Sequence, residues 1–224
     1  MKKFKLIFIL VISFIIFGLF TYSAHVKDIK DIKDRENAAE ILRKQDENMK
    51  FTLDMIYAMD EIHEAEEIID DFSGIDLFQI YTIREKYINS RRYLEKWINI
   101  DDEIKNKTVE ELNLALDYFD AFVNSWIMGI EDNDASKIKL GAVKIKEGRS
   151  SVMSAAGALV LQDGGLEYSA EGKEVILKVI SNLEWFNEID NNRIKYIQDG
   201  GDYREFEAES EYFGLIMLRN KLLN

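Results

Sequence analysis

The sequence contains no cysteine and no proline among its 224 residues. Without cysteine the protein has no disulfide framework, no thiol nucleophile and no metal site built from thiolates. It also lacks the cysteine to which a bacterial lipoprotein attaches its lipid. Because proline breaks helices and marks loops, its absence from a chain of this length favours long helices joined by glycine-containing turns.

Positively charged residues are also scarce. Lysine and arginine number 29 against 42 aspartates and glutamates, which gives a net charge of -13 at pH 7. Such a balance repels the phosphates of nucleic acids and anionic lipid headgroups, so nucleic acid is not expected as a partner. Hydrophobic residues at 47% and charged residues at 32% are typical of a folded globular chain. The length fits one domain, or one domain with an appendage.

The N-terminus carries the clearest targeting signal in the chain. Three lysines lie within the first five residues, and residues 6–20 follow with only Ser13 and Gly18 as non-hydrophobic interruptions. Small or polar residues then close the segment at 21–24. A charged start, an apolar run and a small-residue end are typical of a secretory signal. The sequence therefore predicts that residues 1–24 are a signal anchor or a signal peptide.

Whether this segment is cleaved stays open from the sequence. A signal-peptide apolar run spans about 7–15 residues and a membrane-spanning helix about 17–25, and the run up to Tyr22 lies between the two. Cleavage after Ser23 places Thr21 at the third residue before the cut, which is tolerable. We favour an uncleaved, single-pass anchor in the cell membrane, with the C-terminal domain outside the cytoplasm because the lysine-rich tail stays inside. The alternative is a secreted or periplasmic protein after cleavage near Ser23.

Apolar residues recur at helical spacing along nearly all of the remaining chain, and no long stretch alternates as a strand does. The sequence predicts an all-α protein, an antiparallel bundle of about six helices preceded by an N-terminal transmembrane or signal helix. Its regions are the segment 1–24, a charged helical stalk or start of the first helix at 25–48, and an acidic helical bundle domain at 49–224.

Capping signals and glycines set the expected ends of these helices. The first helix is expected from Val26 to Phe72, with a bend or restart near 38–48, and the second is capped by Asp76. The third has Thr108 and Glu111 as a capping box, and the fourth runs from 132–134 to 163–165. The fifth is capped by Ser169 and ended by 199–201, and the sixth runs from Tyr203 to about Lys221.

The acidic stretch at 60–71 is the strongest candidate for chemistry. A di-iron carboxylate bundle needs a Glu-x-x-His pair on each of two helices and two further inward glutamates. Asp60 and His63 give this spacing once, with aspartate for glutamate, and the only other histidine, His25, adjoins the apolar N-terminal segment. We therefore interpret the stretch as a solvated acidic helix face with its isoleucines turned inward. Weak binding of a hard cation stays open.

Two shorter motifs resemble known sites but are not interpreted as such. Residues 132–136 begin like a calcium loop, but Lys137 stands where the loop needs glycine and Val143 where it needs glutamate. A helix N-terminus rich in capping residues explains the same letters. Residues 106–108, Asn-Lys-Thr, match an N-glycosylation acceptor, which we treat as a chance match.

Small residues and tryptophans suggest packing before chemistry. The small residues at 150–158 predict a close contact between helices, inside the bundle or between protomers. A serine nucleophile there needs a base, and no histidine lies in the second half of the chain.

The three tryptophans, Trp97, Trp126 and Trp185, fall on apolar stripes. Core packing is the favoured explanation for them, and a ligand pocket between helices is the alternative.

These observations predict a place for the protein more firmly than an activity. We expect a membrane-tethered extracytoplasmic helical protein, held in the membrane by its N-terminal helix, that acts as an interaction or structural component of the cell envelope through a protein partner or self-association. No catalytic, cofactor-binding or metal-ligating residue is predicted, no cofactor is expected, and the protein is not expected to be an enzyme. The alternative is an extracytoplasmic ligand-binding, sensory module with an aromatic-lined pocket.

Overall fold

A computed structural model describes the backbone of residues 2–70, 77–161, 166–202 and 212–223. Side chains are described within these ranges from residue 33 onward, except those of Leu77 and Leu161. Every helix or strand in the described ranges is an α-helix, so the all-α prediction is confirmed. Among the described residues no helix is long and apolar enough to cross a membrane. The side chains of the predicted segment 1–24 lie outside this description, and the signal anchor stays a prediction.

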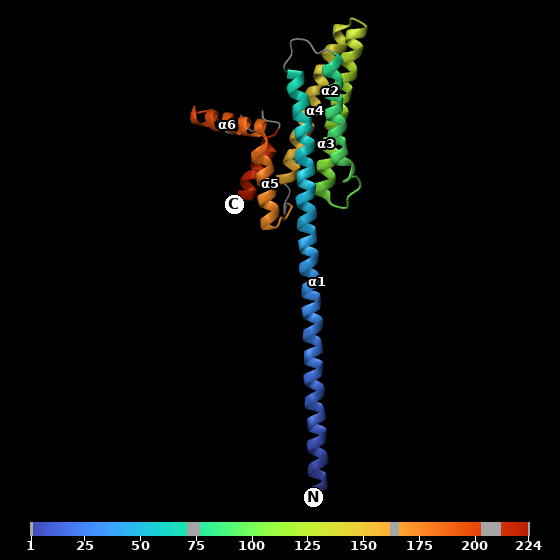
Figure 1. Cartoon of the computed structure of the whole chain (residues 1–224), viewed down its shortest axis with the longest axis vertical. Coiled ribbons are helices and arrows are strands. Elements are labelled where there is room, and N and C mark those ends of the chain that lie inside the picture. The colour runs from blue at the N-terminus through green and yellow to red at the C-terminus, as the bar shows by residue number, and fades with distance from the viewer. Residues whose placement is uncertain (1, 71–76, 162–165, 203–211, 224) are drawn as a thin grey trace. The chain divides into compact units, whose positions relative to one another are not determined.

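Seven helices are described (Figure 1). They are α1 (Lys2–Asp70), α2 (Leu77–Glu95), α3 (Glu103–Glu131), α4 (Ala135–Leu161), α5 (Ala170–Asn182), α6 (Glu184–Gln198) and α8 (Phe213–Leu223). The chain divides into two compact units, Met1–Lys44 and Gln45–Asn224, and α1 contributes residues to both. We refer to them as the N-terminal unit and the C-terminal unit and describe each by itself.

The predicted restart near 38–48 is wrong, because α1 is one uninterrupted helix there. The apolar stripe thins in this stretch, and every side chain from Lys33 to Lys44 is exposed. Helix propensity explains the continuity. Residues 25–70 contain neither glycine nor proline, and the thinned stretch is rich in alanine, glutamate, leucine and arginine, which are strong helix formers.

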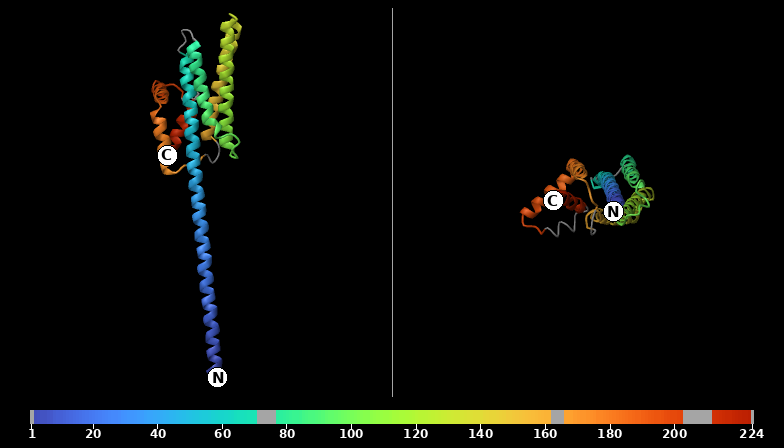
Figure 2. Two further views of the ribbon diagram at one scale, coloured as in Figure 1. Left: turned by 45° about the vertical axis from the view of Figure 1, so that its right-hand side comes forward. Right: turned by 90° about the horizontal axis from the view of Figure 1, so that it is seen from below.

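In the C-terminal unit, α3 and α4 run antiparallel and lie side by side in both Figure 1 and Figure 2. The turn between them places Asn133 in the left-handed region, with a φ of 53°. Arg91 of α2 connects this pair to α2, since it donates hydrogen bonds to Asp117 and Asp120 of α3 at 2.8 and 2.9 Å. Short turns thus produce antiparallel neighbours here, as the sequence predicts.

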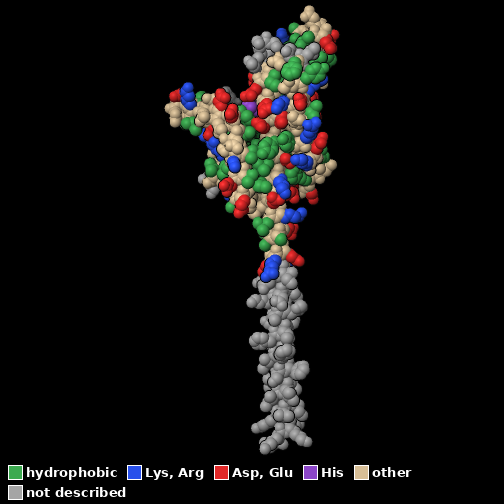
Figure 3. Space-filling model, viewed as in Figure 1, with side chains coloured by type: hydrophobic (Ala, Val, Ile, Leu, Met, Phe, Trp, Pro, Cys, Tyr) green, Lys and Arg blue, Asp and Glu red, His purple; other side chains and the backbone are tan. Residues whose placement is uncertain are grey.

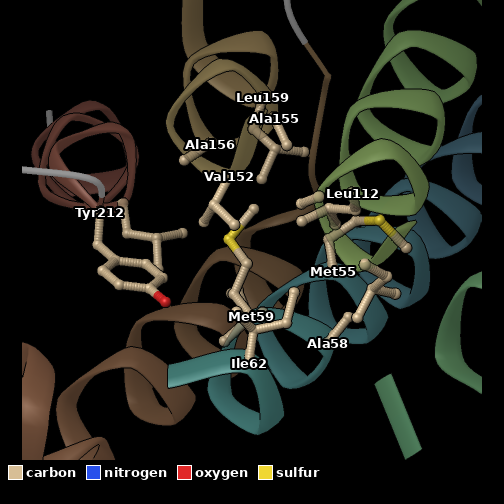
Figure 4. Close-up of a cluster of buried hydrophobic side chains, with 14 of the residues drawn as sticks. Met55, Ala58, Met59, Ile62, Leu112, Val152, Ala155, Ala156, Leu159 and Tyr212 are labelled. Atoms are coloured by element: carbon tan, nitrogen blue, oxygen red, sulfur yellow. The ribbon is translucent and has the colours of Figure 1, made fainter. Parts of the chain in front are cut away.

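The core of the C-terminal unit lies along the residues of α1 that follow Phe51. Met55, Met59 and Ile62 of α1 point toward Leu112 of α3 and Val152 of α4 (Figure 4). The predicted inward stripes are confirmed for these buried positions: Ile56, Ile62, Ile69, Leu112, Ala115, Leu116, Phe119, Phe122, Val123, Val152, Ala156, Leu159 and Ile176. They are wrong for Leu42, Ile130 and Ile194, which are exposed. Burial of these side chains is the main term that stabilises the unit.

The third helix begins earlier than predicted. Its cap is Asp102, whose Oδ1 accepts hydrogen bonds from the backbone N–H groups of Ile104 and Lys105 at 3.1 Å. Thr108, the predicted cap, lies one turn inside the helix with no exposed surface, and its hydroxyl donates to the carbonyl of Ile104 at 2.8 Å. A side-chain oxygen six residues upstream therefore satisfies the free N–H groups first. Because Thr108 is the third residue of the Asn-Lys-Thr motif, its burial is consistent with the interpretation of that motif as a chance match.

The predicted fifth helix is two helices. Its α5 part ends at Asn182 and α6 begins at Glu184, with Leu183 between them in extended backbone at a ψ of 109°. The break follows Ser181 and Asn182, which form helix poorly because their side chains compete for backbone groups. The side chain of Asn187 donates to the freed carbonyl of Ser181 at 3.0 Å and stabilises the break.

Several predicted helix ends are confirmed. Ser169 caps α5 by accepting the N–H of Gly172 at 3.0 Å, and Asp134 accepts the N–H of Ser136 at 2.9 Å at the start of α4. Gly200 follows α6 with a φ of 89°, a left-handed conformation that favours glycine. The predicted cap at Asp76, the ending at 163–165 and the start of the sixth helix at Tyr203 lie outside the described residues.

The small residues of α4 pack against α8, so the predicted close helix–helix contact lies inside the unit. Gly214 lies so close to Ala156 that a Cβ on it would overlap the main-chain carbon and oxygen of Ala156. Both residues are buried. Backbone atoms cannot move aside as a flexible side chain can, so the contact depends on the missing side chain of Gly214.

We predict that Gly214→Ala destabilises the full chain by about 1–3 kcal/mol, the usual cost of forcing a methyl group into a packed interior. For a chain of this length that lowers the Tm by roughly 2–4 °C per kcal/mol. Thermal unfolding in non-ionic detergent measures the change. Gly172→Ala is the matched control, because its nearest neighbour there is the flexible side chain of Ser169 at 3.2 Å. An unchanged Tm in the Gly214 variant would contradict the contact.

Candidate functional site

The acidic segment of α1 has two buried faces. Ile62 and Ile69 point into the core, as predicted. Asp60, His63 and Glu66 follow one another at helical spacing along a second face. The interpretation of the stretch as a solvated face is wrong for these three side chains, because aromatic and basic side chains from later in the chain cover them.

His63 lies between two aromatic rings. Its ring centroid is 4.5 Å from that of Trp185 of α6, with the planes tilted by 33°, and 5.3 Å from that of Tyr212, which meets it edge-on. Trp185 also donates its Nε1–H to Oδ1 of Asp60 at 2.6 Å. Three parts of the chain thus meet at one turn of α1, and offset aromatic contacts of this kind add to the energy of burial.

Glu66 places a carboxylate in the interior, with only 3% of its surface exposed. Its Oε2 accepts a hydrogen bond from the hydroxyl of Tyr212 at 2.8 Å, and its Oε1 accepts one from Nε of Arg149 at 3.2 Å. Arg149, which belongs to α4, also donates to Asp70 of α1 at 2.8 Å. Pairing of this kind is required, because a buried charge without partners is strongly destabilising.

Burial is the largest influence on both titratable groups beside Trp185. It lowers the pKa of His63, against the opposing effect of the carboxylates of Glu67 and Asp60. It raises the pKa of Asp60, against the opposing hydrogen bond from Trp185. Burial therefore shifts each group toward its neutral form relative to the same group in water. A neutral imidazole beside a protonatable carboxyl can exchange a proton, but aromatic rings cover both the face and the edge of this imidazole.

The rest of the acidic stretch is solvated only in part, because the side chain of Glu61 is 20% exposed and pairs with Lys86 at 3.2 Å, and Asp71 lies outside the described residues. The side chains of Glu67 and Asp70 are 64% and 66% exposed. Asp60 and His63 share a face, as their spacing predicts. Within the described ranges, no group of three or more histidine or acidic side chains comes together closely enough to hold a metal ion. That the protein binds no metal or cofactor stays a prediction.

The three tryptophans have different neighbours. Trp97 packs edge-on against Phe51 with ring centroids 5.2 Å apart and donates its indole N–H to Asp54 at 2.8 Å. Trp126 lies on α3 beside Phe122, with ring centroids 5.8 Å apart. The third is part of the His63 cluster. These contacts favour core packing over a shared aromatic pocket.

Two surface hollows lie elsewhere in the C-terminal unit, and neither is lined by a tryptophan. The first has a volume of about 340 Å³ and is lined by Gln45, Leu166, Glu167, Tyr168, Lys173, Lys221 and Leu222. The second has a volume of about 420 Å³ and is lined by Glu61, Asn89, Arg92, Tyr93 and Lys96. Sequence reasoning did not identify either, because each combines elements that are distant along the chain.

Comparison of the chain with models of protein families, with curated proteins and with solved structures gave no match.

The His63 cluster predicts a pH-dependent stability. Because burial lowers the pKa of His63 in the folded state, the unfolded state takes up the proton first, near its ordinary pKa of about 6.5. Stability is therefore complete above that pH and falls as the pH drops through it. The raised pKa of Asp60 acts in the opposite direction. We expect the Tm of the full chain to fall between pH 7.5 and 5.5.

His63→Phe keeps an aromatic ring in the stack and removes the titration, so its Tm should change much less over this range. His25→Gln removes the other histidine and should retain the full dependence of the native chain. Thermal unfolding at several pH values compares all three proteins. Equal pH dependence in His63→Phe and in the native chain would show that another group is responsible.

Proposed function

We propose that the protein is a membrane-tethered component of the cell envelope whose helical domain lies outside the cytoplasm and acts by interaction or structural support, without catalysis. The observation that carries this proposal is the apolar run at 6–20, preceded by lysines and followed by small residues. On this proposal the antiparallel bundle follows an N-terminal transmembrane helix, and the lysine-rich tail stays in the cytoplasm.

The contacts of the C-terminal unit agree with a non-catalytic role. Several charged side chains of its interior form ion pairs between elements. Lys105 of α3, for example, is almost fully buried and pairs with Glu47 of α1 at 2.6 Å. Asp190 of α6 pairs with Arg219 of α8 at 2.7 Å. Such ion pairs fix helices against one another and leave no free reactive group at these positions.

The surface supports a protein partner or a second copy of the chain, and no nucleic acid. Acidic, basic and hydrophobic side chains are interspersed on the face that Figure 3 shows. The net charge of -13 disfavours a polyanion. Contact with the membrane is assigned to the N-terminal helix alone.

A second candidate function is an extracytoplasmic ligand-binding module. The tryptophan pocket that first suggested it has no support from the separate contacts of Trp97, Trp126 and Trp185. The hollow of about 340 Å³ beside α5 and α8 favours it instead. The side chains that line it determine which ligands fit.

Fractionation of cells that express the full chain, with sequencing of its mature N-terminus, tests the tether. We predict an intact chain in the membrane fraction, released only by detergent, and a C-terminal unit that external protease digests in spheroplasts. An intact chain in the cytosol would contradict the proposal. A chain that starts at Ala24 in the soluble extracytoplasmic fraction would overturn the anchor and leave the secreted alternative.

A matched pair of variants assigns the result to the apolar run. Val11→Arg with Ile15→Arg introduces two charges into it, each of which costs about 2.5–3.5 kcal/mol at the centre of a membrane helix. We expect this variant to leave the membrane fraction. Ile41→Arg with Leu42→Arg adds the same charges at two exposed positions of α1 and should leave the distribution unchanged.

A further inference from the structure

The hollow beside α5 and α8 collects residues from four parts of the C-terminal unit. Gln45 comes from α1, residues 166–168 precede α5, Lys173 lies in the first turn of α5, and Lys221 lies in the last turn of α8. Figures 1 and 2 show that the beginning of α5 lies beside the end of α8. The volume of about 340 Å³ is near the lower limit for small-molecule sites.

Two lysines of this hollow have no ion-pair partner among the described residues. Within the described part of the chain neither Lys173 nor Lys221 makes an ion pair or a side-chain hydrogen bond. The second hollow differs, because each charged side chain there has a partner: Glu61 pairs with Lys86, Arg92 with Asn89, and Lys96 with Asp54. In a protein with a net charge of -13, two unpaired cations at one hollow are a local reversal of sign.

The start of α5 adds to this positive potential. Lys173 lies in its first turn, where the free N–H groups of a helix carry a partial positive charge. Ser169 caps the helix and accepts the N–H groups of Gly172 and Lys173, at 3.0 and 2.9 Å, which orders this turn. Among the described residues of the lining Glu167 is the one acid, and it lowers the affinity of the hollow for an anion. Glu171, also in the first turn of α5, offsets part of the positive potential there.

The floor of the hollow is apolar and rigidly held. Leu166 and Leu222 line it and are themselves buried. Tyr168 is fixed by a hydrogen bond of 2.9 Å between its hydroxyl and that of Thr52. Burial raises the pKa of Tyr168 to about 12, so its hydroxyl stays protonated and brings no second negative charge. Asn48 donates to the carbonyl of Glu167 at 2.9 Å and fixes the segment before α5 to α1.

We infer that this hollow binds a small soluble organic anion, with its carboxylate, phosphate or sulfate group between Lys173 and Lys221 and its apolar part against Leu166 and Leu222. Cations on one side and buried leucines on the other match the two ends of such a ligand. The inference concerns the C-terminal unit alone, so it does not depend on whether the N-terminal segment anchors the chain.

Fluorine NMR of 4-fluorobenzoate with the purified full chain in non-ionic detergent tests it, with empty micelles as the blank. 4-Fluorobenzylamine, a cation of the same size at neutral pH, is the matched probe. We expect line broadening that saturates for the carboxylate and none for the amine. No binding of 4-fluorobenzoate at millimolar concentrations, or equal binding of the two probes, would overturn the inference.

Variants locate the binding. Lys173→Gln with Lys221→Gln should weaken binding about tenfold, because each exposed charge contact contributes modestly. Lys146→Gln with Lys178→Gln removes the same charge at lysines outside the hollow and should bind as the native chain does. Glu167→Gln should bind about two- to fivefold more tightly. A gain in affinity cannot result from misfolding. Equal losses in the two lysine pairs, or weaker binding by Glu167→Gln, would overturn the assignment.

Discussion

The buried carboxylate of Glu66 is the constraint on which the arrangement of the C-terminal unit depends. A charge removed from water is tolerated only with partners, and those of Glu66 come from distant parts of the chain. Arg149 belongs to α4, and Tyr212 immediately precedes α8. Trp185 of α6 adds a hydrogen bond one and a half turns earlier on α1, at Asp60. One face of a single helix thereby fixes three later segments.

This constraint explains why α1 is covered on two sides. Its apolar face supplies side chains such as Met59 to the core shared with α3 and α4, and Tyr212 reaches the same region with its hydroxyl directed toward α1 (Figure 4). Asp60 and Glu66 pair with side chains of the segments that cover α1. Functional contacts with other molecules are therefore expected outside this core. The tether rests on the N-terminal apolar run, and anion binding rests on the unpaired lysines near the ends of α5 and α8.

Much of the fold could be predicted from local pattern, because helical periodicity and caps such as Ser169 act within a few residues. Local pattern failed where two signals competed: Asp102 capped α3 ahead of Thr108, and strong helix formers kept α1 continuous where its stripe thins. The polar cluster could not be predicted from the sequence. Its partners are 125 residues apart for Asp60 and Trp185, and periodicity does not show which distant side chain covers a polar face.

A double-mutant cycle between Glu66 and Arg149 tests the role of the buried carboxylate most directly. The free energy of unfolding of the full chain is measured by urea denaturation for Glu66→Gln, Arg149→Gln and the double variant. Arg149→Gln leaves the buried carboxylate of Glu66 without its counter-charge, and Glu66→Gln leaves Arg149 with Asp70 alone. We therefore predict that the double variant loses less stability than the sum of the two, by at least about 1 kcal/mol. Losses that add to within about 0.5 kcal/mol would contradict the account, because the two side chains would then act independently.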